Sequence, residues 1–278
     1  MRLIVEHSTC YRYSDPVRFV VQSLKLSPSR VDGQRVIRWS VAAEGCTITA
    51  AFTDGYGDEV LTLTCAEARD EVHVKVSGEV VTADMAGVLR GHKEKISPRA
   101  FLRQTGMTEP TDEIRDLALG VAAGLGRTDD QQPGTLDLAH ALSDAVADAV
   151  VYAPGTTHAH TTAGEALAEG QGVCQDHAHI LITAARLLGL PARYVSGYLF
   201  ADANGEPHEA AHGWAELWLD GLGWVGFDAS NRTCPTEAYI RLGAGLDARD
   251  AAPIKGVHVG AAEEAMDVSL VVQEAQQQ

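Results

Sequence analysis

Cys174 is the residue of this 278-residue chain whose surroundings most favour nucleophilic chemistry. It lies two residues after Gly172 and begins a stretch with apolar residues at helical spacing, which ends before Gly189 and Pro191. This pattern predicts a helix that starts at the cysteine. Backbone N–H groups and the dipole at a helix start stabilise an anion, so the position favours the thiolate, the nucleophilic form. Most cysteines are buried and inert, and this placement distinguishes Cys174 from them.

A nucleophilic thiol needs a base within hydrogen-bond reach and a third group that orients the base. His212 and Asp228 could fill these roles, because the residues around the turn at Asp220-Gly221 alternate as two strands of a hairpin. A tight hairpin places the position opposite Asp228 between about residue 212 and residue 215. Taken alone, Asp228 fits an ordinary turn aspartate better. The three residues together predict thiol acyl chemistry.

The segment His208-Glu209-Ala210-Ala211-His212 offers a rival chemistry, because it matches the H-E-x-x-H pattern of zinc proteases. In those enzymes the two histidines share one face of a helix. Here Pro207 precedes the pattern, Gly213 follows it, and the next residues alternate as in a strand. A zinc hydrolase, with Glu237 as a further ligand, is therefore the weaker alternative, and we expect no metal and no cofactor.

The reacting carbonyl also needs hydrogen-bond donors for its oxygen and a wall that excludes water. The backbone N–H of Cys174 is the natural first oxyanion donor. Gln171 is a candidate for the second donor, although a surface position is more usual for a glutamine. Trp214, two residues after His212, could form a wall of the cleft and exclude water, although core packing is its ordinary role.

Four histidines occur as two closely spaced pairs. His158 and His160 lie on a predicted loop and could line the mouth of the site. His177 and His179 fall on the predicted helix, where residues two apart lie about 200° apart around the axis. They cannot hold one metal ion together, so ordinary polar contacts are the better interpretation of the second pair.

The elements that position these residues divide into two predicted domains. From Arg2 to Thr82, short β-branched runs are separated by turn signals such as Asp32-Gly33 and Ser77-Gly78, which predicts an all-β, sandwich-like domain over residues 1–90. The strands are expected at 17–26, 36–42, 48–52, 60–64 and 72–81. Periodicity is lost between Ala83 and Pro110, so residues 91–110 are expected to be a linker and 111–278 the catalytic domain.

The second domain is predicted to begin with helices and to end with strands. Thr111 precedes an acidic first turn and helical spacing up to Gly126, and a second helix is expected over 136–151. Thr162 and Glu165 form a capping box for a third helix. After the Cys174 helix the period changes to two over 194–200, 214–219 and 224–228. Helices followed by an antiparallel sheet make an α+β domain.

The composition restricts the partners and the compartment. A net charge of −16 repels phosphate backbones and anionic lipid, so we expect no nucleic-acid partner and no membrane. No apolar run approaches the roughly 18 residues of a spanning segment, and the first residues do not have the pattern of an export signal. These observations predict a cytoplasmic protein. Five cysteines without paired spacing argue against a disulfide framework and leave at least one free thiol.

Four sequence blocks around these positions resemble the transglutaminase-like superfamily, in its bacterial branch with a β-rich N-terminal domain. They are Gly172-Val173-Cys174-Gln175-Asp176 and the segments 187–198, 212–216 and 223–228, with looser similarity at Tyr11-Arg12-Tyr13 and Asp54-Gly55-Tyr56-Gly57. The resemblance implies a papain-like domain of helices packed on an antiparallel sheet, with a Cys-His-Asp site to which Cys174, His212 and Asp228 correspond.

Two positions depart from the pattern of this family. His177 stands where its bacterial members usually carry an aromatic residue, and Gly213 replaces a more usual alanine or cysteine. The pocket beside the nucleophile is therefore expected to differ. The resemblance favours hydrolysis of a peptide or isopeptide bond in a peptide or protein substrate, with transamidation as the alternative, and leaves the oligomeric state open.

Overall fold

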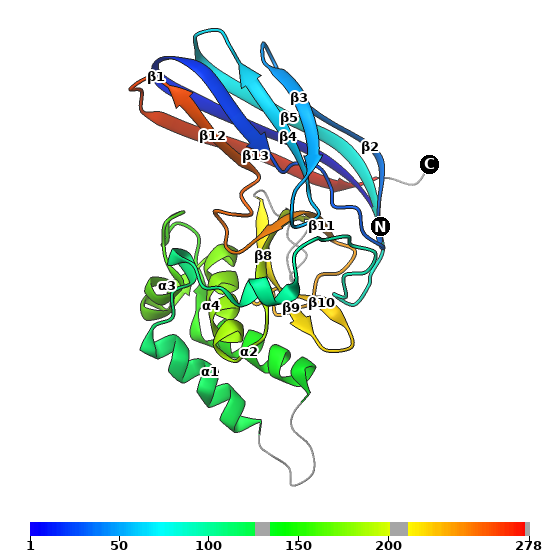
Figure 1. Ribbon diagram of the computed structural model, residues 1–278, viewed down its shortest axis with the longest axis vertical. Helices are drawn as coiled ribbons and strands as arrows, with labels where there is room; N and C mark the ends of the chain where they lie inside the picture. The colour runs from blue at the N-terminus through cyan, green and yellow to red at the C-terminus, as the bar shows by residue number, and fades with distance from the viewer. Residues whose placement is uncertain (126–133, 201–210, 276–278) are drawn as a thin grey trace.

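The computed structural model describes residues 1–125, 134–200 and 211–275, and divides into a β-strand region above a helical region built around a small sheet (Figure 1). The α+β class expected from the sequence is confirmed. None of the helices in the described ranges is long and apolar enough to cross a membrane.

The upper region is built on one long strand. β1 (Arg2–Leu24) pairs with β5 (Arg69–Thr82) along its first half and with β4 (Glu59–Cys65) along its second half. β2 (Gln34–Ala43) pairs with β5, and β3 (Thr47–Thr53) pairs with β4. Leu63 of β4 and Val74 of β5 share one buried cluster, because alternate residues of both strands point inward. All five expected strands are present, although β1 begins well before the predicted residue 17.

Two strands from the end of the chain complete this upper sheet. β12 (Ile254–Val259) and β13 (Glu264–Glu274) both pair antiparallel with β1, so that Leu3 lies opposite Glu274. The second domain was expected to span residues 111–278. In the structure, however, residues 254–274 of this range form strands of the N-terminal sheet. Alternation predicts a strand but not its partner, since any strand edge offers the same backbone groups.

The segment expected to be a linker is packed against the lower region. It contains the 3₁₀ helices η1 (Pro98–Leu102) and η2 (Gly106–Thr108). The buried ring of Phe101 lies 5.1 Å from that of Trp224 in an edge-to-face arrangement, and just before the segment the backbone N–H of Leu89 donates to the carbonyl of Trp224 at 2.9 Å. These contacts fix the connection between the two regions.

The lower region surrounds one central helix. α4 (Cys174–Leu187) packs against α1 (Asp112–Gly124), α2 (Thr135–Ala149) and α3 (Ala163–Glu169). The starts of α1 and α3 follow the sequence signals. Thr111 caps α1 by accepting from the backbone N–H of Ile114, and Thr162 with Glu165 forms the predicted capping box of α3. The short strands β6 (Val151–Tyr152) and β7 (Gln171–Gly172) pair in parallel just before α4.

A four-stranded sheet covers the other side of α4. Its order is β10-β9-β8-β11, with β8 (Ala192–Leu199), β9 (His212–Leu219), β10 (Gly223–Phe227) and β11 (Tyr239–Gly245). The hairpin predicted around Asp220-Gly221 is present between β9 and β10. All eight residues of β8 are buried, including the polar Arg193 and Ser196.

A buried ion network joins the two regions. Glu216 of β9 accepts from Arg193 Nε at 2.7 Å and from Arg241 Nε at 2.9 Å, and Arg241 Nη1 also donates to Asp58 of the upper region at 2.9 Å. Burial raises the pKa of Glu216, but the two arginines more than offset it and hold this pKa at about 2. The carboxylate therefore stays charged between the domains.

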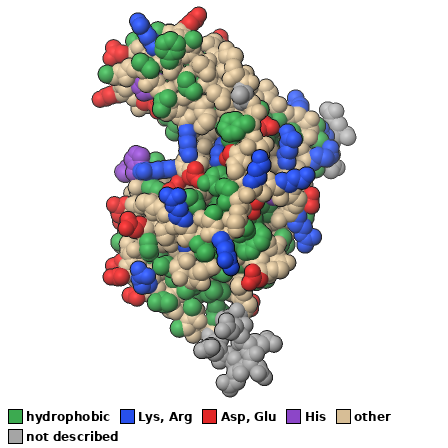
Figure 2. All heavy atoms as spheres, in the orientation of Figure 1, with side chains coloured by type: hydrophobic (Ala, Val, Ile, Leu, Met, Phe, Trp, Pro, Cys, Tyr) green, Lys and Arg blue, Asp and Glu red, His purple; other side chains and the backbone are tan. Residues whose placement is uncertain are grey.

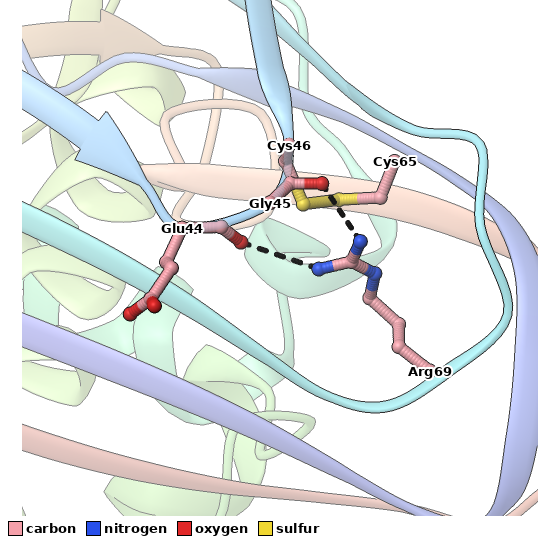
Figure 3. The surroundings of a disulfide bond; sticks show 5 residues. All are labelled: Glu44, Gly45, Cys46, Cys65 and Arg69. Carbon is pink, nitrogen blue, oxygen red and sulfur yellow. Dashed lines mark hydrogen bonds between the residues drawn. A yellow bond between two sulfur atoms is a disulfide. The ribbon is translucent and has the colours of Figure 1, made fainter.

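The expectation that the cysteines form no disulfide is wrong for one pair. Cys46 precedes β3 and Cys65 ends β4, and the pairing of these strands brings their Cα atoms to 4.5 Å, where they form a disulfide (Figure 3). Arg69 donates to the carbonyls of Glu44 and Gly45 beside it, at 3.2 and 2.7 Å. Cys10, Cys174 and Cys234 are free thiols, so the expectation of a free thiol is confirmed.

Candidate active site

The three residues of the predicted triad come together in the structure. Cys174 begins α4, His212 begins β9 and Asp228 follows the last residue of β10. His212 Nε2 lies 2.6 Å from Asp228 Oδ2, and the imidazole is also hydrogen-bonded to the Cys174 thiol. All three are buried, with exposed fractions of 8%, 2% and 1%. Since Nε2 faces the carboxylate, Nδ1 is the ring nitrogen left for the sulfur.

The hairpin register brings His212 and Asp228 together. Phe227 lies opposite Ala215, which places Asp228 in line with Trp214 and one pleat away from His212. The predicted position opposite Asp228, between residues 212 and 215, is therefore confirmed. The side chain of His212 reaches diagonally across the sheet to the carboxylate.

Three side chains besides the imidazole donate to the Asp228 carboxylate. Ser230 Oγ donates to Oδ1 at 2.6 Å, while Asn231 Nδ2 and the Tyr239 hydroxyl donate to Oδ2 at 2.8 Å each. Burial raises the pKa of Asp228, but the charge of His212 and the hydrogen bonds from His212, Ser230 and Asn231 lower it far below the usual range. Asp228 is thus a fixed anion at neutral pH.

The electrostatics favour a charged imidazole. Burial lowers the pKa of His212, but the negative charges of Cys174 and Asp228 and their hydrogen bonds raise it to about 10. An imidazolium held beside Cys174 and Asp228 can give a proton to a leaving group. A charged imidazole is the form that can act as the acid in thiol acyl transfer.

The start of α4 is pinned by an acidic residue. Asp176 Oδ2 accepts from the backbone N–H of Val173 at 2.8 Å and from the Thr157 hydroxyl at 2.7 Å. The backbone N–H of Cys174 stands at the first helical position, which has no acceptor within the helix. It is therefore placed to donate to an oxyanion formed next to the sulfur.

A cleft with a volume of about 380 Å³ opens at Cys174 and His212. Its lining is Ala159, His160, Val173, Cys174, Gln175, Tyr194, Ser196, Ala211, His212, Ala248, Arg249, Ala252 and Pro253. A larger cavity of about 560 Å³ lies in the N-terminal domain beside Trp39 and Arg35, and its lining contains no cysteine or histidine. Cys174 and His212 therefore belong to the smaller cleft.

Tyr194 explains the unusual glycine beside His212. A Cβ atom at Gly213 would collide with the Tyr194 hydroxyl, so this ring can lie at the cleft only because residue 213 has no side chain. Burial and the charges of Cys174, Asp176 and Asp228 raise the pKa of Tyr194 well above its usual range. Its hydroxyl stays neutral and available as a donor.

The remaining candidates have different surroundings. His160 lines the cleft, as expected for the mouth of the site. Trp214 is buried behind His212, with ring centroids 6.3 Å apart. The ring nitrogens of His177 lie 2.9 and 3.0 Å from the carbonyls of Val173 and Val150, so His177 has a structural role. His158 and Gln171 are exposed and are not part of the cleft lining.

The structure describes only part of the H-E-x-x-H segment on which the zinc alternative rests. His208 and Glu209 lie outside the described residues, while His212 is held by Asp228. Within the described ranges, the group of side chains that could hold a metal is Cys10, Glu71 and His73 in the N-terminal domain. Glu71 also accepts from Arg12 at 3.1 Å, and this group is not part of the cleft at Cys174.

Sequence reasoning missed several residues of the site. Ser230 and Asn231 follow Asp228 directly in a turn, and their residue types are those that bond to a nearby aspartate, so this local signal could have identified them. Tyr239, Tyr194 and Arg249 carry no such signal, because tertiary packing alone brings them to the cleft or to Asp228.

Comparison with known proteins agrees with this geometry. Residues 121–229 match the model of the transglutaminase-like superfamily, and residues 3–81 match that of the bacterial transglutaminase-like N-terminal region. An uncharacterised protein of Mycobacterium leprae is 30% identical over 273 residues, which cover 96% of each chain. One of Mycobacterium tuberculosis is 26% identical over 296 residues, covering 98% of this chain and 92% of that protein.

A solved structure has the same fold over the whole chain. The crystal structure of a candidate cysteine protease from Cytophaga hutchinsonii superimposes with a TM-score of 0.74 at 22% identity, covering 100% of this chain and 92% of that one. The full-length relative and the two family matches together establish the assignment. The chain belongs to the transglutaminase-like superfamily.

Proposed function

We propose that the protein hydrolyses an amide bond of a peptide or protein substrate, at a peptide or isopeptide linkage, through a thioester on Cys174. The observation that carries this proposal is the buried contact of 2.6 Å between His212 and Asp228, with the Cys174 thiol hydrogen-bonded to the same imidazole. The C. hutchinsonii structure, named as a candidate cysteine protease, supports the same reaction class.

The reaction follows from the roles of the three side chains. The Cys174 thiolate attacks the carbonyl carbon, and the backbone N–H of Cys174 donates to the oxyanion. The C–N bond then breaks as the His212 imidazolium gives its proton to the leaving amine, which forms the thioester. His212, now neutral, takes a proton from water as the water attacks the thioester. The acid leaves, and the thiolate–imidazolium pair is restored while Asp228 holds the ring in place.

Transamidation shares every step up to the thioester and differs only in the nucleophile that releases it. The purified protein should be assayed on glutaminyl and dipeptide substrates, with and without a primary amine, beside the Cys174→Ala variant. Hydrolysis predicts free acid without amine and no product from the variant. Product that forms only when amine is present would identify a transamidase instead.

A further inference from the structure

Arg249 is the charged residue of the catalytic cleft that the proposed mechanism does not use. Apart from the catalytic residues, the described lining is mostly small or apolar, and it contains no aspartate or glutamate. The chain as a whole carries a net charge of −16. Basic and histidine side chains nevertheless gather at the lower lip of the hollow between the two regions (Figure 2). The exposed Arg249 therefore places a positive charge beside Cys174 in a protein whose net charge is negative.

The acids next to Arg249 in sequence are bound elsewhere. Asp247 is buried, and its Oδ1 accepts from the backbone N–H of Asp250 at 2.8 Å. Asp250 Oδ2 accepts from the backbone N–H of Leu246 at 3.0 Å and from the Tyr56 hydroxyl. Within the described part of the chain, no carboxylate forms an ion pair with Arg249. Its guanidinium is thus available to an external anion.

The turn that carries Arg249 is held in place. The backbone N–H of Ala248 donates to His179 Nε2 at 3.0 Å, and Ser196 Oγ donates to the carbonyl of Ala251 at 2.9 Å. Arg249 Nη2 donates to His160 Nδ1 at 2.8 Å, across the cleft mouth. This contact uses one donor of the guanidinium, which has five, and leaves others for a planar acceptor.

We propose that Arg249 binds a carboxylate of the substrate while Cys174 attacks an amide bond nearby. The inference rests on the proposed acyl chemistry and names its substrate class: short peptides with an acidic side chain or a free C-terminal carboxylate close to the scissile bond. A cleft of about 380 Å³ is near the lower end of the range for small-molecule sites, which suits one or two residues. The small side chains around it favour a compact acyl group.

Alkylation of Cys174 tests the charge recognition without any substrate. Iodoacetate carries a carboxylate and iodoacetamide is its neutral analogue, so the ratio of their rates at Cys174, followed by mass spectrometry of the peptide, reports anion binding at the cleft. Arg249→Gln should lower this ratio about tenfold, while Arg249→Lys should keep most of it. Arg232→Gln is the matched control, because Arg232 is exposed and paired with Asp148. An unchanged ratio in Arg249→Gln would overturn the inference.

Turnover then identifies the source of the carboxylate. Dipeptides with a free C-terminus are compared with their C-terminal amides, and glutamyl with glutaminyl side chains, in the wild type and in Arg249→Gln. The inference expects kcat/KM to fall about tenfold to a hundredfold for the substrates that place a carboxylate at Arg249, and little for their capped forms. An equal loss for capped and free substrates would show a structural role for Arg249.

Binding separates the failure of this inference from the failure of the proposed function. If Cys174 reacts with neither reagent and no substrate is turned over, the proposed acyl chemistry is wrong. The Arg249 inference is then decided by calorimetry on the Cys174→Ala protein with N-acetylglutamate and N-acetylglutamine. Tighter binding of the glutamate, lost in the Arg249→Gln double variant, supports it, and equal binding of the two ligands contradicts it.

Discussion

His212 donates from Nε2 to Oδ2 of Asp228 across 2.6 Å, and the side chains of both residues are only 1% exposed. This contact fixes both the orientation of the imidazole and the nitrogen that faces Cys174. It also keeps two opposite charges together in a site with little water, where their attraction is much stronger than in solution.

Two replacements of Asp228 distinguish the effect of its negative charge from the effect of its hydrogen bond to His212. Asp228→Asn keeps an acceptor for His212 but removes the negative charge that helps to raise the pKa of His212 to about 10. We expect the high-pH limb of kcat/KM to move to lower pH in this variant. Asp228→Ala should lose about a hundredfold or more in kcat, because the base is no longer oriented. Asp148→Asn, at an exposed aspartate, is the control. An unmoved limb in Asp228→Asn would show that the charge has no role.

The same pair predicts how stability depends on pH. The pKa of His212 is raised in the folded state from 6.5 to about 10, so its contribution is fully present below pH 6.5 and is lost as pH rises to about 10. Urea unfolding across this window should show a free energy of unfolding that falls less steeply with pH in His212→Gln than in the wild type. Identical slopes would contradict the charged state of His212.

The ion network between the domains should be costly to break. Glu216→Gln leaves Arg193 and Arg241 buried without their shared carboxylate, and we expect it to lower the free energy of unfolding by about 3–5 kcal/mol. The pKa of Glu216 is lowered from 4.5 to about 2, so its contribution is present above pH 4.5 and lost as pH falls to about 2. Glu71→Gln, at an exposed bridge, serves as the control. Equal unfolding midpoints in urea would contradict this assignment.

Gly213 and Tyr194 should be coupled. Gly213→Ala places a Cβ against the Tyr194 hydroxyl, and overpacking of this kind costs about 1–3 kcal/mol. Combining it with Tyr194→Leu should recover part of that loss, which a double-mutant cycle of unfolding free energies measures. Gly120→Ala is the control, because a Cβ atom there meets no other atom within 4 Å. Gly221 is unsuitable as a control site, because its φ of +81° is unfavourable to alanine. Additive effects of the two changes would mean that the residues do not interact.

The Cys46–Cys65 disulfide predicts a thiol count. The chain has five cysteines, and alkylation in denaturant without reductant should modify the three free ones, Cys10, Cys174 and Cys234. Reduction should expose all five. It should also lower the free energy of unfolding by about 3 kcal/mol, the value for a loop of this size. Five reactive thiols before reduction would exclude the bond. The cytoplasmic location stays a prediction, and a persistent disulfide would argue for a more oxidising compartment.

The parts of the site that depend on neighbouring residues could be predicted from the sequence. The sequence places Cys174 at a helix start because capping and apolar spacing act within a few residues. It also predicts that His212 and Asp228 lie together, because one short hairpin connects them and its register follows from the turn. Periodicity likewise indicated the strands of the N-terminal domain and the four helices.

Only the tertiary structure decided which distant segments meet. The pairing of β12 and β13 with β1, the disulfide at Cys65 and the Tyr239 bond to Asp228 all join residues that no local pattern connects. The same holds for Arg249, which reaches the cleft because its turn is tied to α4 through His179. A strand edge, a thiol or a guanidinium can bind many partners equally well, so its actual partner depends on how the whole chain packs.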